Sequence, residues 1–87
     1  MNHMLILVED TKGLQSILNT NKIIRAVDVH PMNIEEPVQI IVHLDHYDGA
    51  ISFSKIAYTY HDQSVKFEQI KSLKDFYLFL SEMQNQN

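Results

Sequence analysis

The amino-acid sequence predicts a small α+β domain: a mainly antiparallel β-sheet of four to six strands with one C-terminal helix packed on a face. Three observations support this prediction. Residues 37–60 alternate like a long β-hairpin, residues 4–8 are apolar throughout, and residues 72–84 carry apolar side chains at helical spacing. We expect the 87 residues to form a single domain, with residues 1–3 and 84–87 frayed.

The composition limits the classes of function. The chain contains no cysteine, which excludes disulfide bonds and thiolate metal sites. Its net charge is −4 and its seven lysine and arginine residues are scattered, whereas a nucleic-acid-binding protein needs a clustered basic surface. The first residues include no basic segment, and the apolar run there is far shorter than the ~20 residues of a membrane span. We therefore expect a cytoplasmic protein with no membrane contact, and we disfavour nucleic acid as a partner.

Three strands are predicted in the first part of the chain. Residues 4–8, MLILV, are typical of a strand that is buried on both faces, and Gly13 ends a polar run that suits a tight turn. Residues 14–18 fit either a strand or a short helix, and we favour the strand because Gly13 belongs in a turn. Residues 22–30 are rich in β-branched side chains, which favours a third strand that Pro31 ends because proline lacks a backbone donor.

The hairpin at residues 37–60 is predicted to turn at Asp48 and Gly49. Two registers are open: a two-residue turn at Asp48 and Gly49 pairs Leu44 with Phe53, and a four-residue loop at residues 46–49 pairs Leu44 with Ile51. They differ by an even shift, so both place the same side chains on the same face. A β-bulge near Ser54 and Lys55 would change the faces of every later residue. The expected core face carries Val38, Ile40, Val42, Leu44, Ile51, Phe53, Ala57 and Thr59, with Lys55 as an exception, and the opposite face carries Gln39, Ile41, His43, Asp45, Ser52, Ser54, Ile56, Tyr58 and Tyr60.

A short strand at residues 65–68 is predicted to lead into the C-terminal helix. Ser72 is suited to cap this helix, and Asp75 lies where a carboxylate interacts favourably with the positive end of the helix dipole. Because one helix covers only one face of a small sheet, some apolar strand surface should stay uncovered in a monomer. We therefore expect a homodimer. The apolar stripe of the helix consists of Leu73, Phe76, Tyr77, Leu80 and Met83, widened by Phe79.

The sequence contains one cluster of possible metal ligands, His43, Asp45 and His46. Imidazole and carboxylate groups suit zinc or another divalent ion, but a credible site needs three or four ligands and no fourth ligand is evident. We favour a solvated polar patch beside the turn, and we expect no metal and no other cofactor. The serines have no Gly-x-Ser-x-Gly context and both glycines are explained by turns, so we expect no enzymatic activity.

The tyrosine-rich end of the hairpin is the strongest candidate for a partner-binding surface. Tyrosine is enriched at interfaces because it combines apolar area with a hydrogen-bonding tip. We predict that Ile41, Ile56, Tyr58 and Tyr60 bind the partner, unless the C-terminal helix covers this face. The expected function is that of a non-enzymatic accessory factor of bacterial or phage origin, an inhibitor or adaptor that binds a protein through an exposed sheet face or edge. Metal binding and regulatory contact with nucleic acid are the alternatives.

Residues 17–27, ILNTNKIIRAV, resemble the small flagellar FlbD-like proteins, in which an asparagine after a strand precedes an isoleucine-rich stretch. The next hairpin of that family, apolar and glycine-bearing, corresponds to residues 39–53. Its closing motif corresponds to residues 67–76, where Glu68 and Ser72 are present at a wider spacing. The resemblance covers about half of the chain. It implies a β-rich accessory or regulatory protein without catalytic residues.

Overall fold

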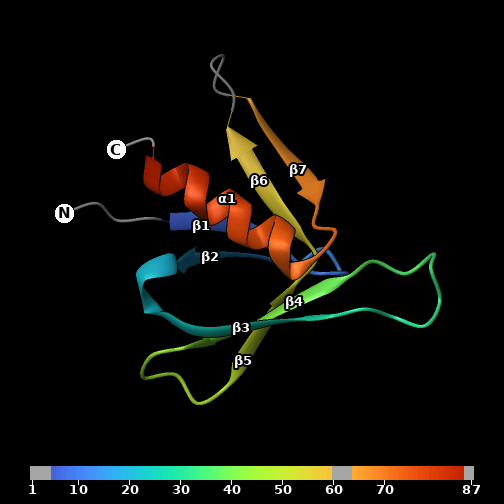
Figure 1. The fold of residues 1–87 in the computed structure, drawn as a ribbon, viewed down its shortest axis with the longest axis horizontal. Helices are drawn as coiled ribbons and strands as arrows, with labels where there is room; N and C mark the ends of the chain where they lie inside the picture. Colours follow the sequence, from blue (N-terminus) through green and yellow to red (C-terminus); the bar gives the residue numbers. More distant parts are fainter. Residues whose placement is uncertain (1–4, 60–63, 86–87) are drawn as a thin grey trace.

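The computed structural model describes residues 5–59 and 64–85, and these residues confirm the predicted small α+β fold with its C-terminal helix (Figure 1). A 3-10 helix, η1, covers Thr20–Lys22, and the α-helix, α1, covers Leu73–Asn85. The helix thus includes residues 84 and 85, and residues 1–4, 60–63, 86 and 87 lie outside the described ranges. The strands are β1 Leu5–Glu9, β2 Gln15–Asn19, β3 Ile23–Val29, β4 Gln39–Leu44, β5 Ala50–Phe53, β6 Lys55–Thr59 and β7 Val65–Gln69.

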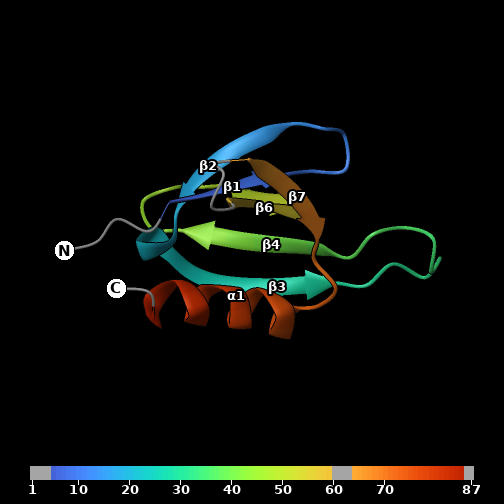
Figure 2. The same ribbon diagram turned by 90° about the horizontal axis from the view of Figure 1, so that it is seen from above.

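The seven described strands form two antiparallel sheets, whereas we expected one sheet of four to six strands. Sheet A has the strand order β2-β1-β6-β7, and sheet B has the order β3-β4-β5. β5 and β6 follow one another in the chain but belong to different sheets, with Ser54 as the corner between them. Figure 2 shows α1 against β3, on the side of the molecule opposite β2.

The corner at Ser54 is fixed by hydrogen bonds from both of its neighbours in sheet A. The backbone N–H of Ser54 donates to the carbonyl oxygen of Glu9 at 2.9 Å, and its carbonyl oxygen accepts from the backbone N–H of Ile70 at 2.9 Å. Ser54 is only 1% exposed, so these bonds satisfy backbone groups that water cannot reach. The chain therefore passes from one sheet to the other without a buried unpaired backbone group, as strands that switch sheets must.

The same corner corrects the faces that we predicted for the second half of the hairpin. Before Ser54, Phe53 points into the core as expected, at 1% exposure. After it, Ile56 points inwards, also at 1% exposure, although we assigned it to the opposite face. The alternation is thus shifted by one residue at Ser54, which is the effect anticipated for an irregularity at this position.

Both predicted hairpin registers are wrong, because β4 and β5 pair Val42 with Ile51 and His43 with Ala50. The loop between the two strands covers residues 45–49, longer than either predicted turn. The difference is again an even shift, so the predicted inward face of β4 is correct: Ile40 and Val42 are fully buried.

Two local predictions in the first part of the chain are confirmed. Residues 15–19 form strand β2, in agreement with the favoured interpretation of residues 14–18. Gly13 has a φ of +89°, a left-handed conformation that glycine adopts without strain. The Asp10 side chain supports this turn by accepting hydrogen bonds from the backbone N–H groups of Lys12 at 2.8 Å and Leu14 at 2.9 Å.

Helix α1 begins as predicted and packs against both sheets. The Ser72 hydroxyl accepts a hydrogen bond from the backbone N–H of Asp75 at 3.2 Å, which caps the helix. Phe76 lies edge-on to Phe53 of sheet B at 5.5 Å, and Phe79 lies edge-on to Tyr58 of sheet A at 4.9 Å. The buried core comprises Ile6, Val8, Leu18, Ile40, Val42, Phe53, Ile56, Ile70 and Phe76.

Replacement of Phe76 by alanine should lower the free energy of unfolding by about 3–5 kcal/mol, because it leaves a cavity beside Phe53. A domain of this size has a total stability of only about 5 kcal/mol, so the variant should be largely unfolded. Urea denaturation followed by circular dichroism measures the change. Leu78→Ala is the control, since Leu78 is 49% exposed and its loss should shift stability by about 0.5 kcal/mol. Equal urea midpoints for F76A and the wild type would contradict this packing.

Candidate functional site

The outer face of sheet A is defined by a row of paired residues. Glu9 of β1 lies opposite Gln15 of β2 and Lys55 of β6, and Lys55 lies opposite Gln69 of β7. Directly paired residues of antiparallel strands share a face, and side chains alternate along each strand. The residues two and four positions along from this row therefore lie on the same outer face. We call the apolar ones, Leu5, Leu7, Ile17, Ala57, Val65 and Phe67, the outer apolar face.

This outer apolar face is substantially open to solvent. Leu5 is 58% exposed, Ile17 is 69% exposed and Val65 is 50% exposed, while the residues between them are half-buried. β1 thus buries Ile6 and Val8 and exposes Leu5, although its uniformly apolar sequence suggested burial on both faces. An apolar strand that is covered on one side only leaves apolar surface for another molecule.

Of the four residues predicted to bind a partner, the three that the structure describes do not form one exposed surface. Ile56 belongs to the core, and Tyr58 is half-buried against Phe79 of the helix. Ile41 lies half-buried on sheet B, paired with residues of β3 and β5. Tyr60 lies outside the described residues. The expectation of an exposed cluster is therefore wrong for Ile56, because the corner at Ser54 turns its side chain inwards.

The predicted metal cluster is only partly assembled. His46 Nε2 lies 3.5 Å from Asp45 Oδ2, and both side chains are exposed. His43 lies on β4 opposite Arg25, and its Nδ1 atom is buried without a hydrogen-bond partner. Among residues 5–59 and 64–85, no three or more histidine, aspartate or glutamate side chains are grouped so that they could hold a metal ion. Asp45 and His46 match the predicted solvated patch, whereas His43 departs from it.

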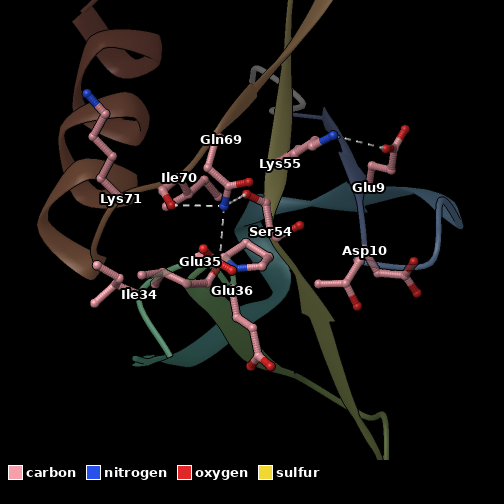
Figure 3. A pocket seen from close by; sticks show the side chains of 13 residues that line it. Glu9, Asp10, Ile34, Glu35, Glu36, Ser54, Lys55, Gln69, Ile70 and Lys71 are labelled. Carbon is pink, nitrogen blue, oxygen red and sulfur yellow. Dashed lines mark hydrogen bonds and ion pairs between the residues drawn. The ribbon is translucent and has the colours of Figure 1, made fainter. Parts of the chain in front are cut away.

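A hollow of ≈ 600 Å³ lies beside the corner at Ser54 (Figure 3). Figure 3 shows the Gln69 amide at its centre, donating to the carbonyl oxygens of Ser54 at 3.0 Å, Ile70 at 3.2 Å and Val38 at 3.4 Å. The side chains around it carry mixed charge, and no histidine lines it, so no hydroxyl here is paired with an imidazole base. Gln69 therefore has a structural role, in which it ties the loop before β4 to the corner.

A second hollow, of ≈ 530 Å³, is an apolar groove between β3 and α1. On the helix its apolar residues follow the spacing i, i+3, i+4, i+7, which places them on one helical face. They belong to the predicted apolar stripe, yet Tyr77 is 66% exposed because β3 covers only part of that stripe. We call this hollow the α1 groove; it is lined by Ile23, Ala26, Leu73, Lys74, Phe76, Tyr77 and Leu80.

Asp28 joins the end of β3 to the start of α1, at one end of the groove. Its Oδ2 atom accepts a hydrogen bond from the backbone N–H of Leu73 at 2.8 Å and lies 2.8 Å from Nε2 of His30. The pKa of Asp28 is lowered from its ordinary value of 3.8, first by the Leu73 N–H group and then by His30. The carboxylate thus acts as a helix cap donated by a strand that is distant in the sequence.

No protein-family model, curated protein or solved structure matches this chain. The resemblance to FlbD-like proteins therefore stays a prediction. In the part of the chain that the structure describes, no helix is both long enough and apolar enough to cross a membrane. The candidate surfaces consequently rest on geometry, namely the outer apolar face and the α1 groove.

The cap at Asp28 predicts a pH dependence of stability. Because folding lowers the pKa of Asp28 below 3.8, its ionised form stabilises the fold above that pH, and this contribution is lost as the pH falls through the folded-state pKa. We expect Asp28→Asn to lower the urea midpoint near neutral pH. The difference from the wild type should shrink at pH values below 3.8. A difference that does not change with pH would show that the charge of Asp28 does not stabilise the helix start.

Proposed function

We propose that this chain is a non-enzymatic accessory protein, an inhibitor or adaptor in a bacterial or phage-infected cytoplasm, that binds a partner protein through the outer apolar face of sheet A. The observation that carries the proposal is the exposure of Leu5, Ile17 and Val65, at 58%, 69% and 50%. Single exposed apolar residues are normal on a protein surface, but neighbouring ones, such as Leu5 and Ile17 on the paired strands β1 and β2, are typical of an interaction site.

The chemistry of this face suits a protein better than the other ligand classes. It is a sheet surface bordered by a polar row, in which Lys55 Nζ lies 3.8 Å from Glu9 Oε1. An apolar centre with a polar rim is the usual anatomy of a protein interface. A nucleic acid would need a basic surface, and the chain carries a net charge of −4.

The size of the face indicates how the partner binds. Four strands about 4.8 Å apart and about five residues long would present roughly 300 Å². The continuous area is smaller than this, because β1 and β6 pair only at Val8–Ile56 and Glu9–Lys55. A stable interface takes about 800 Å² from each partner, so the partner must also contact neighbouring surface. The edge of β2 offers such surface, since Leu14 beside it is 67% exposed and an edge strand carries backbone groups that are free to pair.

The test compares capture and binding by the wild type and by the double variant Leu5→Ser/Ile17→Ser. Proteins from a bacterial lysate that bind the wild type are purified, and their affinities for the wild type and for the double variant are measured by calorimetry. We expect binding to weaken by at least about tenfold, because two apolar side chains lose their burial in the interface.

Ile24→Ser is the matched control, since Ile24 is 70% exposed but lies on β3 of sheet B. This variant should bind like the wild type. Equal binding by the wild type and the double variant would rule out the outer apolar face as the binding surface.

A further inference from the structure

We infer that the chain forms a dimer in which the loop at residues 30–38 of each copy docks into the α1 groove of the other. This inference goes beyond the proposed function, because it concerns another surface and a second copy of the same chain. It rests on the exposure of the loop, the dimensions of the groove and the charges of both.

The loop carries two large apolar side chains that its own copy leaves in solvent. Met32 is 103% exposed and Ile34 is 97% exposed. Figures 1 and 2 both show that the loop between β3 and β4 projects beyond the body of the molecule. Two fully exposed apolar side chains two residues apart on a projecting loop are typical of a segment that inserts into another surface.

The tip of the loop is already ordered by its own hydrogen bonds. Asn33 Oδ1 accepts from the backbone N–H of Glu35 at 3.0 Å, and the Asn33 carbonyl oxygen accepts from the backbone N–H of Glu36 at 3.0 Å. A segment that is held in a turn before binding loses less conformational entropy when it docks. The loop therefore suits insertion as a preformed unit.

The α1 groove has the length and chemistry to receive this tip. From Leu73 to Leu80 the helix rises about 10 Å, while two residues such as Met32 and Ile34 lie at most about 7 Å apart along the chain. Apart from Lys74, every residue that lines the groove is apolar or aromatic. The groove thus accommodates two apolar side chains side by side.

The charges around loop and groove are complementary. Glu35 and Glu36 follow Ile34 directly, whereas Lys74 lines the groove and Lys22 precedes Ile23, which also lines it. The two carboxylates near the start of α1 already accept hydrogen bonds: Asp28 from the Leu73 N–H group, and Asp75 from the Lys71 N–H group at 3.2 Å. In a chain with a net charge of −4, these two lysines, Lys22 and Lys74, favour an apolar and acidic segment, and the loop is one.

The topology allows both loops to dock at once. One end of the groove lies where β3 ends and α1 starts, at the hydrogen bond from the Leu73 N–H group to Asp28. The opposite end is lined by Ile23 and Leu80. A twofold axis that sets the two β3 strands antiparallel brings the loop after one β3 to the start of the other. Each copy then donates one loop and receives one, which gives a closed dimer.

Sedimentation of the full chain over a range of concentrations tests the dimer. We expect a reversible dimer whose dissociation constant rises at least about tenfold in Met32→Ser/Ile34→Ser and in Tyr77→Ser, since these positions supply the loop tip and the groove rim. All three side chains are more than half exposed in one copy, so the fold should persist. Leu14→Ser and Leu78→Ser, at 67% and 49% exposure, are controls outside both surfaces and should dimerise normally.

A charge exchange tests the same contact in another way. Glu35→Lys/Glu36→Lys and Lys74→Glu should each weaken the homodimer, and a mixture of the two variants should form a heterodimer of restored affinity. A wild type that stays monomeric at every concentration would overturn the inference, even if a peptide of residues 29–38 binds the groove. A dimer that is broken by Ile17→Ser but not by the loop variant would overturn it as well, and would place the second copy on the outer apolar face.

Discussion

The backbone hydrogen bonds of Ser54 are the constraint on which the rest of the structure depends. Glu9 and Ile70 approach Ser54 at 2.9 Å, one from the end of β1 and one from the end of β7. A buried backbone group without a partner costs about 1–3 kcal/mol, so the chain can turn between the sheets only where both partners are present. This corner sets which side chains of β6 face inwards. It therefore directs Ile56 into the core and leaves Ala57 on the outer apolar face.

Features that depend on neighbouring residues were predictable from the sequence. Gly13 marks a left-handed turn, Ser72 caps a helix, and alternation in residues 38–44 identifies the inward face of β4. The corner was not predictable, because a serine within an alternating strand also suits the solvent-facing side. Its burial depends on hydrogen-bond partners far away in the sequence, and local patterns do not report such partners. Ser54 itself and Ile56 after it are buried, although both were assigned to the face opposite the core.

The sequence indicated that apolar surface would stay uncovered, but not which residues would form it. The apolar run of β1 indicated more apolar surface than one helix can cover, and the structure places that surplus on Leu5 and its neighbours. The stripe of α1 suggested a helix that lies flat on a sheet. Instead α1 packs against Phe53 of one sheet and Tyr58 of the other, so its flank with Tyr77 stays open as a groove. Which side chains remain uncovered thus depends on how the sheets are arranged.

The outer apolar face and the α1 groove lie on opposite sides of the molecule. In Figure 2, β2 of sheet A lies at one side and α1 at the other. Their rims also differ in charge: the Glu9–Lys55 pair borders the outer apolar face, whereas Lys74 lines the α1 groove. Self-association through the groove would therefore leave both outer faces accessible. Such a dimer would present two copies of one modest binding face to a partner, and a partner with two matching sites would bind through an effective concentration rather than through a larger interface. Dimerisation would thus compensate for a face of less than roughly 300 Å², which is too small to bind tightly alone.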